Sequence, residues 1–337
     1  MKRADLPELA ALERIIELGA GFLQSEIVGF SELPNGQQLP IYVIALGSAD
    51  PLVPAVGYFG GVHGLERIGT EVVTAYLHSL VMRLAWDSTL HRQLETVRLV
   101  FMPLVNPGGM YMGTRANPHG VDLMRNAPVD ASKPVPFLVG GQRFSARLPW
   151  YRGAAGAPMQ SEGQAICNVV RKDMLPRAVS MSVDCHSGFG VRDRIWFPYA
   201  HTRTPIAHLA EVHALKRIFA QSHHYHRYTI EPQSLQYLAH GDLWDYLYME
   251  NLRLGNGVFL PLTLEMGSWL WVKKNPRQLF SRHGIFNPLI EHRQQRVLRQ
   301  HQQFLDFLSR AACGHRLWLP TGQVRMQEHA LALEEWY

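Results

Sequence analysis

The chain has 337 residues, of which 47% are hydrophobic, and carries a formal net charge of +5. It is long enough to bury a large core, and its charge excess is mild and not gathered into runs of like charge, which argues against nucleic-acid and membrane partners. No apolar run reaches the length of about 18 residues that a membrane span needs. Three scattered cysteines and an N-terminus interrupted by acidic residues exclude a disulfide framework and a signal peptide, so we expect a cytoplasmic protein.

Segments rich in β-branched and aromatic residues alternate with segments of helical periodicity. In chain order we expect strands at 39–47 and 55–62, a helix at 71–85, a strand at 97–106, a helix capped by Ser161, strands at 178–187 and 195–200, helices at 204–222 and 240–251, a strand at 258–268 and a helix at 288–312. This alternation predicts a layered α/β domain with a largely parallel sheet. We expect one domain over 1–337, with its core at about 38–312, an N-terminal helix and a C-terminal tail.

The segment 127–160 differs from its surroundings. It is rich in proline, glycine and alanine and has no sustained period. A loop of this length inside a compact domain is usually functional or disordered. The sequence therefore leaves open whether this loop closes over a site.

Two strand ends carry side chains that can bind a metal ion. His63 and Glu66 follow the strand at 55–62 in the string GGVHGLE, and ligands bind at the carboxyl ends of strands in open α/β sheets. Taken alone, this pair fits an ordinary polar turn as well as a metal site. His186 ends a second strand, and two imidazoles with one carboxylate are a ligand set of catalytic zinc, which keeps a further position for water.

Other histidines have simpler interpretations. His208 and Glu211 repeat the same spacing inside the expected helix at 204–222, where they fit a solvated helix face. The string SHHYHRY at 222–228 has three histidines but no carboxylate at a useful spacing. We interpret it as an exposed turn.

Charged residues elsewhere extend the candidate site. Glu265 ends the strand at 258–268, where a carboxylate is costly unless it is paired, hydrogen-bonded or used, so it is either a salt-bridged rim residue or functional. Arg115 and Arg125 fit surface charges, but a planar guanidinium also suits carboxylates and developing oxyanions. Asp122 can bind metal, although a partner that orients a metal-binding histidine is the better interpretation.

Together these strings resemble the carboxypeptidase A-like zinc metallocarboxypeptidases and share features with the related succinylglutamate desuccinylases and aspartoacylases. Within about 55–270, the matching strings are GGVHGLE, NPGG, RANPHGVDLMRN, YRGAAGAPMQSE, DCHS and LTLEMG. The resemblance implies a single domain with a twisted, mixed but mostly parallel eight-stranded sheet flanked by helices. It also implies one zinc ion bound by His63, Glu66 and His186.

The resemblance implies catalytic roles as well. Glu265 would be the general base, Arg115 would stabilise the oxyanion, and Asp122 would hold His63 in the right tautomer. The implied activity is zinc-dependent hydrolysis of an amide bond next to a free carboxylate, as in a metallocarboxypeptidase acting on peptides.

Substrate-binding roles follow from the same resemblance. Arg125 would hold the substrate carboxylate, Tyr237 would be the mobile tyrosine, and Leu243 would lie near an apolar specificity pocket. Met124 departs from the family pattern because it replaces an asparagine that helps to bind the carboxylate, and a thioether donates no hydrogen bond. This departure keeps open an N-acyl amino acid deacylase, and a catalytically silent binding protein is a further alternative.

Overall fold

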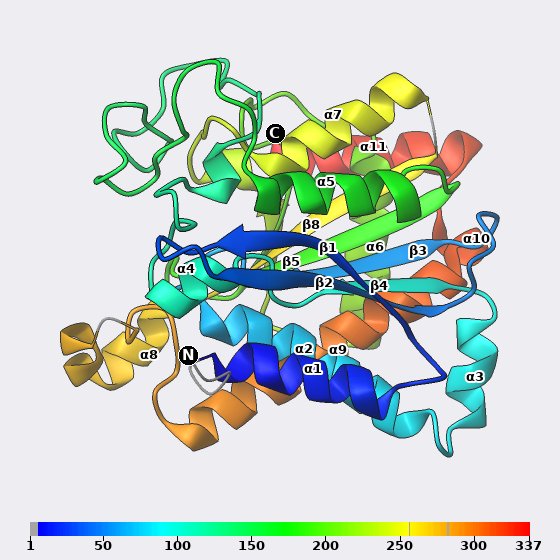
Figure 1. Ribbon diagram of the computed structural model, residues 1–337. Helices are drawn as coiled ribbons and strands as arrows, with labels where there is room; N and C mark the ends of the chain where they lie inside the picture. The colour runs from blue at the N-terminus through cyan, green and yellow to red at the C-terminus, as the bar shows by residue number, and fades with distance from the viewer. Residues whose placement is uncertain (1–5, 256, 282) are drawn as a thin grey trace.

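The computed structural model describes residues 6–255, 257–281 and 283–337. Within them, eight strands form one mixed sheet with helices on both faces (Figure 1). The strands are β1 (Gln24–Glu32), β2 (Gln38–Gly47), β3 (Ala55–Gly60), β4 (Arg98–Met102), β5 (Val179–Ser187), β6 (Arg194–Phe197), β7 (Thr229–Pro232) and β8 (Val258–Met266). The predicted α/β class and eight-stranded sheet are confirmed.

The strand order is β1-β2-β4-β3-β5-β8-β6-β7. The four central strands β4, β3, β5 and β8 run parallel, whereas β2 and β6 are antiparallel to their central neighbours. Every residue of β3, β4 and β5 is buried, as expected of strands covered on both faces. The carboxyl ends of the central strands therefore meet at one edge of the sheet.

The helices form the two outer layers. Helices α1, α2 and α9 lie on one side of the sheet and α5 and α7 on the other (Figure 1), with α2 and α9 packed on β3 and β5 and α7 on β8. No helix in the described residues is long and apolar enough to cross a bilayer. The helices are α1 (Pro7–Leu18), α2 (Arg67–Arg83), α3 (Ser88–Leu94), α4 (Pro107–Met112), α5 (Ser161–Asp173), α6 (Leu209–Ser222), α7 (Leu243–Leu254), α8 (Trp269–Lys274), α9 (Glu291–Cys313), α10 (His315–Trp318) and α11 (Gly322–Trp336), with short 3₁₀ turns η2 (Leu123–Arg125), η3 (Gln233–Leu235) and η4 (Pro276–Phe280).

Most predicted segments overlap elements of the expected type, but two details are wrong. The strand expected at 97–106 ends at Met102, because Pro103 has no N–H to continue the ladder. Ser161 does not cap α5. Gln160 is the N-cap residue, and the Ser161 hydroxyl donates to the Phe30 carbonyl and to the Glu162 carboxylate instead of accepting from a helix N–H.

Both ends of the chain contribute more secondary structure to the folded domain than expected. Strand β1 precedes the predicted core start at 38, yet it pairs with β2 as the edge of the sheet. The expected C-terminal tail forms α11, which packs on α6. The Trp336 indole N–H donates to the Ile230 carbonyl at 2.9 Å, which fixes α11 to β7.

Candidate metal centre and active site

His63 and Glu66 lie in the turn that joins β3 to α2. The chain turns at Gly61, whose φ of +64° is a conformation that glycine adopts without strain. The Glu66 N–H donates to the His63 carbonyl at 3.0 Å. Glu66 is the N-cap residue of α2, but its side chain caps no helix N–H, so its carboxylate is free to face the end of β5.

Helix α2 approaches β5 closely, and this brings Glu66 to His186. A Cβ at Gly69 would lie 2.1 Å from the Cys185 carbonyl oxygen, so only glycine fits there. The Ser187 N–H donates to Glu66 Oε2 at 2.9 Å, and His186 Nδ1 lies 3.1 Å from the same oxygen.

The three predicted ligands form a buried cluster. One ligand atom from each of His63, Glu66 and His186 lies within 4.8 Å of the others, and no other such group was found among the described residues. His63 Nδ1 is buried and has no hydrogen-bond partner. An unpaired buried lone pair is costly, and a bound cation would satisfy it. Two imidazoles and a carboxylate are hence a donor set that fits zinc.

Asp184 orients His186, and our sequence reasoning missed it. The two residues are two apart on β5 and so lie on the same face of the strand. Asp184 Oδ2 accepts hydrogen bonds from His186 Nε2 at 2.7 Å and from the Trp244 indole at 3.0 Å. This leaves His186 Nδ1 facing Glu66, which is the orientation that a carboxylate partner imposes on metal-binding histidines. The spacing in DCHS was the signal that could have identified Asp184.

The two imidazoles differ in their electrostatic surroundings. Burial and the Arg115 guanidinium lower the pKa of His63 well below its ordinary value. Burial also disfavours the charged form of His186, but the Asp184 and Glu66 carboxylates outweigh it and raise the pKa of His186 well above its ordinary value. In the metal-free protein, a proton on His186 thus partly balances two carboxylates, a role that a divalent cation would take over.

The Arg115 guanidinium points into the metal cluster. Its Nη2 lies 2.7 Å from His63 Nε2, and it donates to Glu66 Oε1 at 3.0 Å and to Asp122 Oδ2 at 2.9 Å. The predicted hydrogen bond between Asp122 and His63 is absent, because Asp122 Oδ1 lies 3.9 Å from His63 Nδ1 and the carboxylate is bound to Arg115. Asp122 therefore fixes Arg115 in this structure.

Glu265 lies beside the cluster at the end of β8. It is the register partner of His186 across the parallel β5–β8 pair, and its side chain is 7% exposed. The Phe189 N–H donates to Glu265 Oε1 at 2.9 Å. Burial and the Glu66 carboxylate raise the pKa of Glu265 to about 8, and a cation at the adjacent ligands would lower it towards neutrality. The carboxylate is thus suited to exchange a proton near neutral pH.

Arg125 and Tyr237 form a second polar pair. Arg125 donates through Nε to the Val139 carbonyl at 3.1 Å, through Nη1 to the Met124 carbonyl at 2.9 Å, and through Nη2 to the Tyr237 hydroxyl at 3.4 Å. A guanidinium has five N–H groups, so these bonds leave one N–H on each terminal nitrogen. The three bonds fix the guanidinium in place, and Arg125 is 3% exposed.

The predicted substrate contact of Leu243 differs from expectation, and Met124, which departs from the family pattern, is buried as well. Leu243, the first residue of α7, is completely buried in the hydrophobic core and offers no surface to a substrate in this structure. The side chain of Met124 is also buried in the core, at 5% exposure. Neither side chain therefore contributes to a binding surface.

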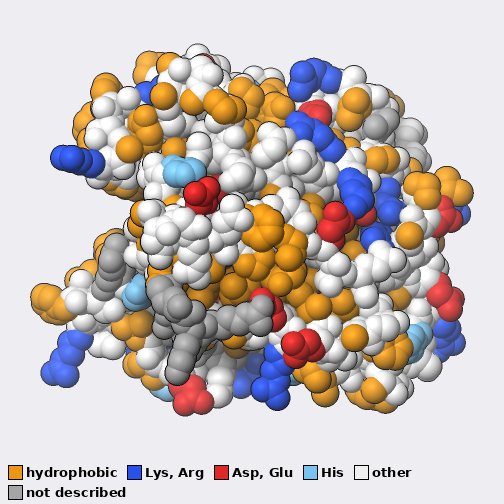
Figure 2. Space-filling model, in the orientation of Figure 1, with side chains coloured by type: hydrophobic (Ala, Val, Ile, Leu, Met, Phe, Trp, Pro, Cys, Tyr) orange, Lys and Arg blue, Asp and Glu red, His pale blue; other side chains and the backbone are white. Residues whose placement is uncertain are grey.

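The long loop at 127–160 packs against the two arginines. The Arg152 side chain donates to the Arg125 carbonyl at 3.1 Å, and the Arg115 guanidinium lies 6.0 Å from the centre of the Trp150 ring. Figure 2 shows a hollow on the left of the molecule, between the upper lobe that contains this loop and the lower part that contains α8. The loop thus forms one wall beside the edge of the sheet that carries the metal cluster.

The two other histidine-containing segments, at 208–211 and 222–228, do not belong to the metal cluster. Glu211 is not on a solvated face as expected. It is 4% exposed and pairs with Arg325 of α11 at 2.6 Å. His208 precedes α6 and bonds the Tyr248 hydroxyl at 3.0 Å. The segment at 222–228 is largely exposed, as expected, with Tyr225 at 97% exposure, and it lines a cavity that is described below.

Fold and site together define the class of α/β proteins that bind one metal ion at the carboxyl edge of a mixed sheet. The chain belongs to the zinc carboxypeptidase family, whose family model matches residues 35–268. The family resemblance expected from the sequence is confirmed, and zinc is the metal that this family uses.

Individual relatives are distant. The chain is 30% identical to carboxypeptidase SOL1 of Arabidopsis thaliana over 107 residues, and 23% identical to carboxypeptidase D of Anas platyrhynchos over 181 residues. These matches cover 31% and 49% of this chain but only 21% and 11% of the relatives' own length.

Solved structures share the fold over most of the chain. Thrombin-activatable fibrinolysis inhibitor superposes with a TM-score of 0.66 at 17% identity, covering 90% of this chain and 72% of that one. Carboxypeptidase A from Helicoverpa armigera gives 0.65 at 17% identity, covering 90% and 71%. At such identities the likeness establishes the fold alone.

Proposed function

We propose that this protein is a zinc-dependent metallocarboxypeptidase, which hydrolyses a peptide bond next to a free carboxylate. The observation that carries the proposal is the position of Glu265, beside the buried cluster of His63, Glu66 and His186 and with a pKa near the neutral range. Membership of the zinc carboxypeptidase family supports it.

His63, Glu66 and His186 would hold the metal ion. Bound zinc would supply a Lewis acid and lower the pKa of a coordinated water to about 7. Glu265 would accept the proton from the attacking water and deliver it to the leaving amine. Its Phe189 N–H bond holds the accepting carboxylate in place throughout.

The two arginines would have different roles, one in stabilising the transition state and one in binding the substrate. Arg115 would stabilise negative charge on the substrate carbonyl oxygen, since its guanidinium already lies against two ligands and is itself fixed by Asp122. Arg125 would bind the free carboxylate through its two remaining N–H groups, with Tyr237 beside it. The buried Met124 cannot assist, so this binding rests on Arg125.

A substrate panel tests the proposal. The zinc-loaded protein should release the terminal residue from peptides with a free C-terminus and leave C-terminally amidated versions of the same peptides intact. Hydrolysis of N-acyl aspartate or N-acyl glutamate without peptide cleavage would instead identify the deacylase. Stoichiometric zinc without hydrolysis of any member would identify a silent binding protein.

We further propose a reducing, cytoplasmic location. The three cysteines are unpaired in the structure, and two of them, Cys167 and Cys185, are buried. Redox labelling of the thiols in cell extracts, compared with the protein in the purified state, tests this location.

A further inference from the structure

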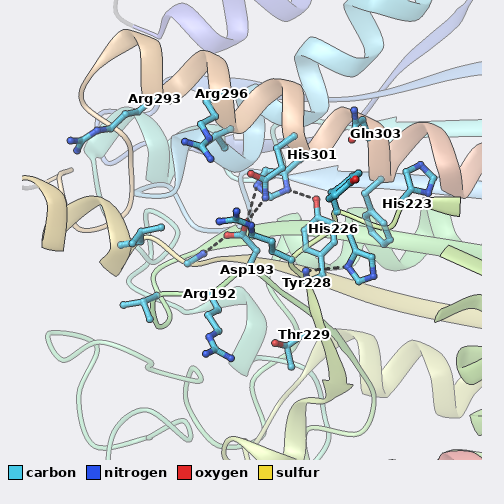
Figure 3. A pocket seen from close by; sticks show the side chains of 18 of the residues that line it. Arg192, Asp193, His223, His226, Tyr228, Thr229, Arg293, Arg296, His301 and Gln303 are labelled. Carbon is cyan, nitrogen blue, oxygen red and sulfur yellow. Dashed lines mark hydrogen bonds and ion pairs between the residues drawn. The ribbon is translucent and has the colours of Figure 1, made fainter. Parts of the chain in front are cut away.

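A large cavity lies beyond the metal cluster. Its volume is about 1160 Å³, and it is lined by residues within 191–193, 219–229, 267–274 and 292–304 (Figure 3). None of the metal ligands lines it. Small-molecule sites usually enclose about 300–1,000 Å³. The cavity is therefore large enough for several residues of a polypeptide and far larger than one inorganic anion requires.

The cavity is close to the active site along the sheet. Arg194, the first residue of β6, is the register partner of Glu265. The wall at 191–193 directly precedes Arg194 and follows Phe189, whose N–H holds the Glu265 carboxylate. The cavity and the catalytic carboxylate are thus separated by one short loop.

Permanent positive charges gather around this cavity. They come from the loop before β6, the segment before β7, helix α8 and helix α9, and in the described part of the chain no ion pair joins any of them to a carboxylate. Several unpaired cations around one concave surface create a positive potential that attracts anions. The cationic side chains are Arg192, Arg227, Lys274, Arg293 and Arg296.

The one carboxylate among the lining residues is already occupied. Asp193 Oδ1 accepts from the Gly267 N–H at 2.9 Å, and Oδ2 accepts from the Gln300 amide at 2.6 Å. Asp193 Oδ2 also lies 4.0 Å from His301 Nε2. These bonds tie the end of β8 to α9, and Figure 3 shows Asp193 between the α9 side chains and the strand beneath. Asp193 is therefore part of the wall, and its single negative charge is outnumbered by the five cations of the lining.

The histidines of the cavity add aromatic surface and no permanent charge. The rings of His223 and His226 each lie 4.7 Å from the ring of Phe219. Burial lowers the pKa of His226 and of His301, and His301 accepts or donates a 2.7 Å hydrogen bond with the Tyr228 hydroxyl. The interior is thus largely neutral and aromatic beneath a cationic rim.

We propose that this cavity is a docking site for an acidic, partly apolar polypeptide segment. Carboxylates of the segment would bind the cationic rim, and its aliphatic side chains would contact Val191 and Leu270, which are 50% and 37% exposed. Single-stranded nucleic acid fits less well, because it needs exposed aromatic faces for stacking. Among the lining Phe, Tyr and Trp residues, Phe219, Trp271 and Phe304 are at most 7% exposed, and Tyr225 is the widely accessible one. The rings of His223 and His226 pack on Phe219.

Binding of a defined probe tests the proposal without any reliance on catalysis. The probe is a fluorescein-labelled peptide of alternating glutamate and leucine with an amidated C-terminus, so that it lacks the carboxylate of a proposed substrate. Its fluorescence anisotropy is measured with the zinc-loaded full chain at low and high salt. Binding should weaken steeply with salt, since charge attraction contributes most of it.

Matched variants locate the binding. Arg293→Gln/Arg296→Gln removes two cations of the rim on α9. The control Arg299→Gln/Arg316→Gln removes two exposed cations, on α9 and α10, that do not line the cavity. The rim variant should bind the peptide about tenfold or more weakly, as expected for the loss of two charge contacts, and the control should match the wild type.

Several results would overturn the proposal. One is an equal loss of peptide affinity in both double variants, and another is unchanged peptide affinity in the rim variant. A third is that oligothymidylate binds more tightly than the peptide and loses the same affinity in the rim variant, which would make this a nucleic-acid site. Inorganic phosphate that binds while the peptide does not would also overturn it. If the rim variant misfolds by circular dichroism, Lys274→Gln on α8 replaces it, with a loss of about threefold expected.

Discussion

Replacing Asp184 with asparagine tests how the structure orients its metal site. The carboxylate accepts the 2.7 Å hydrogen bond from His186 Nε2 and is completely buried. Asparagine has nearly the same shape and keeps an acceptor oxygen, so the change removes the charge and little else. Because His186 Nδ1 faces Glu66, any loss of ring orientation or basicity should appear as weaker zinc binding.

The magnitude follows from this one contact. A hydrogen bond to a charged partner contributes about 1.5–3 kcal/mol, and a neutral acceptor gives roughly half of that. Asp184→Asn should therefore cost about 1–1.5 kcal/mol, or about tenfold in zinc affinity. Asp184→Ala removes the whole contact and also leaves the Trp244 indole N–H unpaired, so it should cost about a hundredfold.

Zinc affinity is measured by competition with a chromogenic chelator. Ser182→Ala is the matched control, because Ser182 lies on the same strand and face, is completely buried, and has a hydroxyl without a hydrogen-bond partner. It should bind zinc like the wild type. Wild-type affinity in Asp184→Asn, or an equal loss in the Ser182 control, would refute the reasoning.

Three further predictions concern the same site. Glu265→Gln should keep stoichiometric zinc by metal analysis but lose about 10²–10⁴-fold in kcat by steady-state kinetics. Wild-type kcat in this variant would contradict the role of Glu265 as general base. Arg115→Ala should lower kcat by about 10²–10³-fold, whereas Arg125→Ala should mainly raise KM by about 10–100-fold; equal effects on kcat would be inconsistent with this division. Zinc at about a hundredfold above its Kd should stabilise the apo-protein by about 2.7 kcal/mol, or roughly 4 °C in Tm, and should leave His186→Ala unchanged in a thermal scan.

The metal ligands were accessible to sequence reasoning because their signals are local. Each predicted ligand lies where an apolar strand ends and the chain turns, and in parallel strands such ends meet at one edge of the sheet. His63 and His186 follow this pattern on the neighbouring strands β3 and β5. The general region of Glu265 follows for the same reason, since β8 is the next parallel strand.

The partners of those ligands were not accessible in the same way. Asp122 was expected to orient His63, yet its short hydrogen bond goes to Arg115 and its distance to His63 Nδ1 is 3.9 Å. This geometry depends on loop contacts such as those of the 127–160 segment. Leu243 was expected at a binding surface, but the packing of α7 buries it. Side-chain direction in loops and at helix ends depends on neighbours that a sequence pattern does not specify.

By itself, the sequence determined the α/β class, the ligand types and the strand ends that carry them, because hydrophobic periodicity and glycine turns act over a few residues. Only the tertiary structure decided which groups orient those ligands, and it alone brought five cations from four separate segments around one cavity. No stretch of the chain contains a run of like charges that would predict this cavity. Its charge arises from folding, because helix and loop packing brings residues about a hundred positions apart, such as Arg192 and Arg296, to the lining of one cavity.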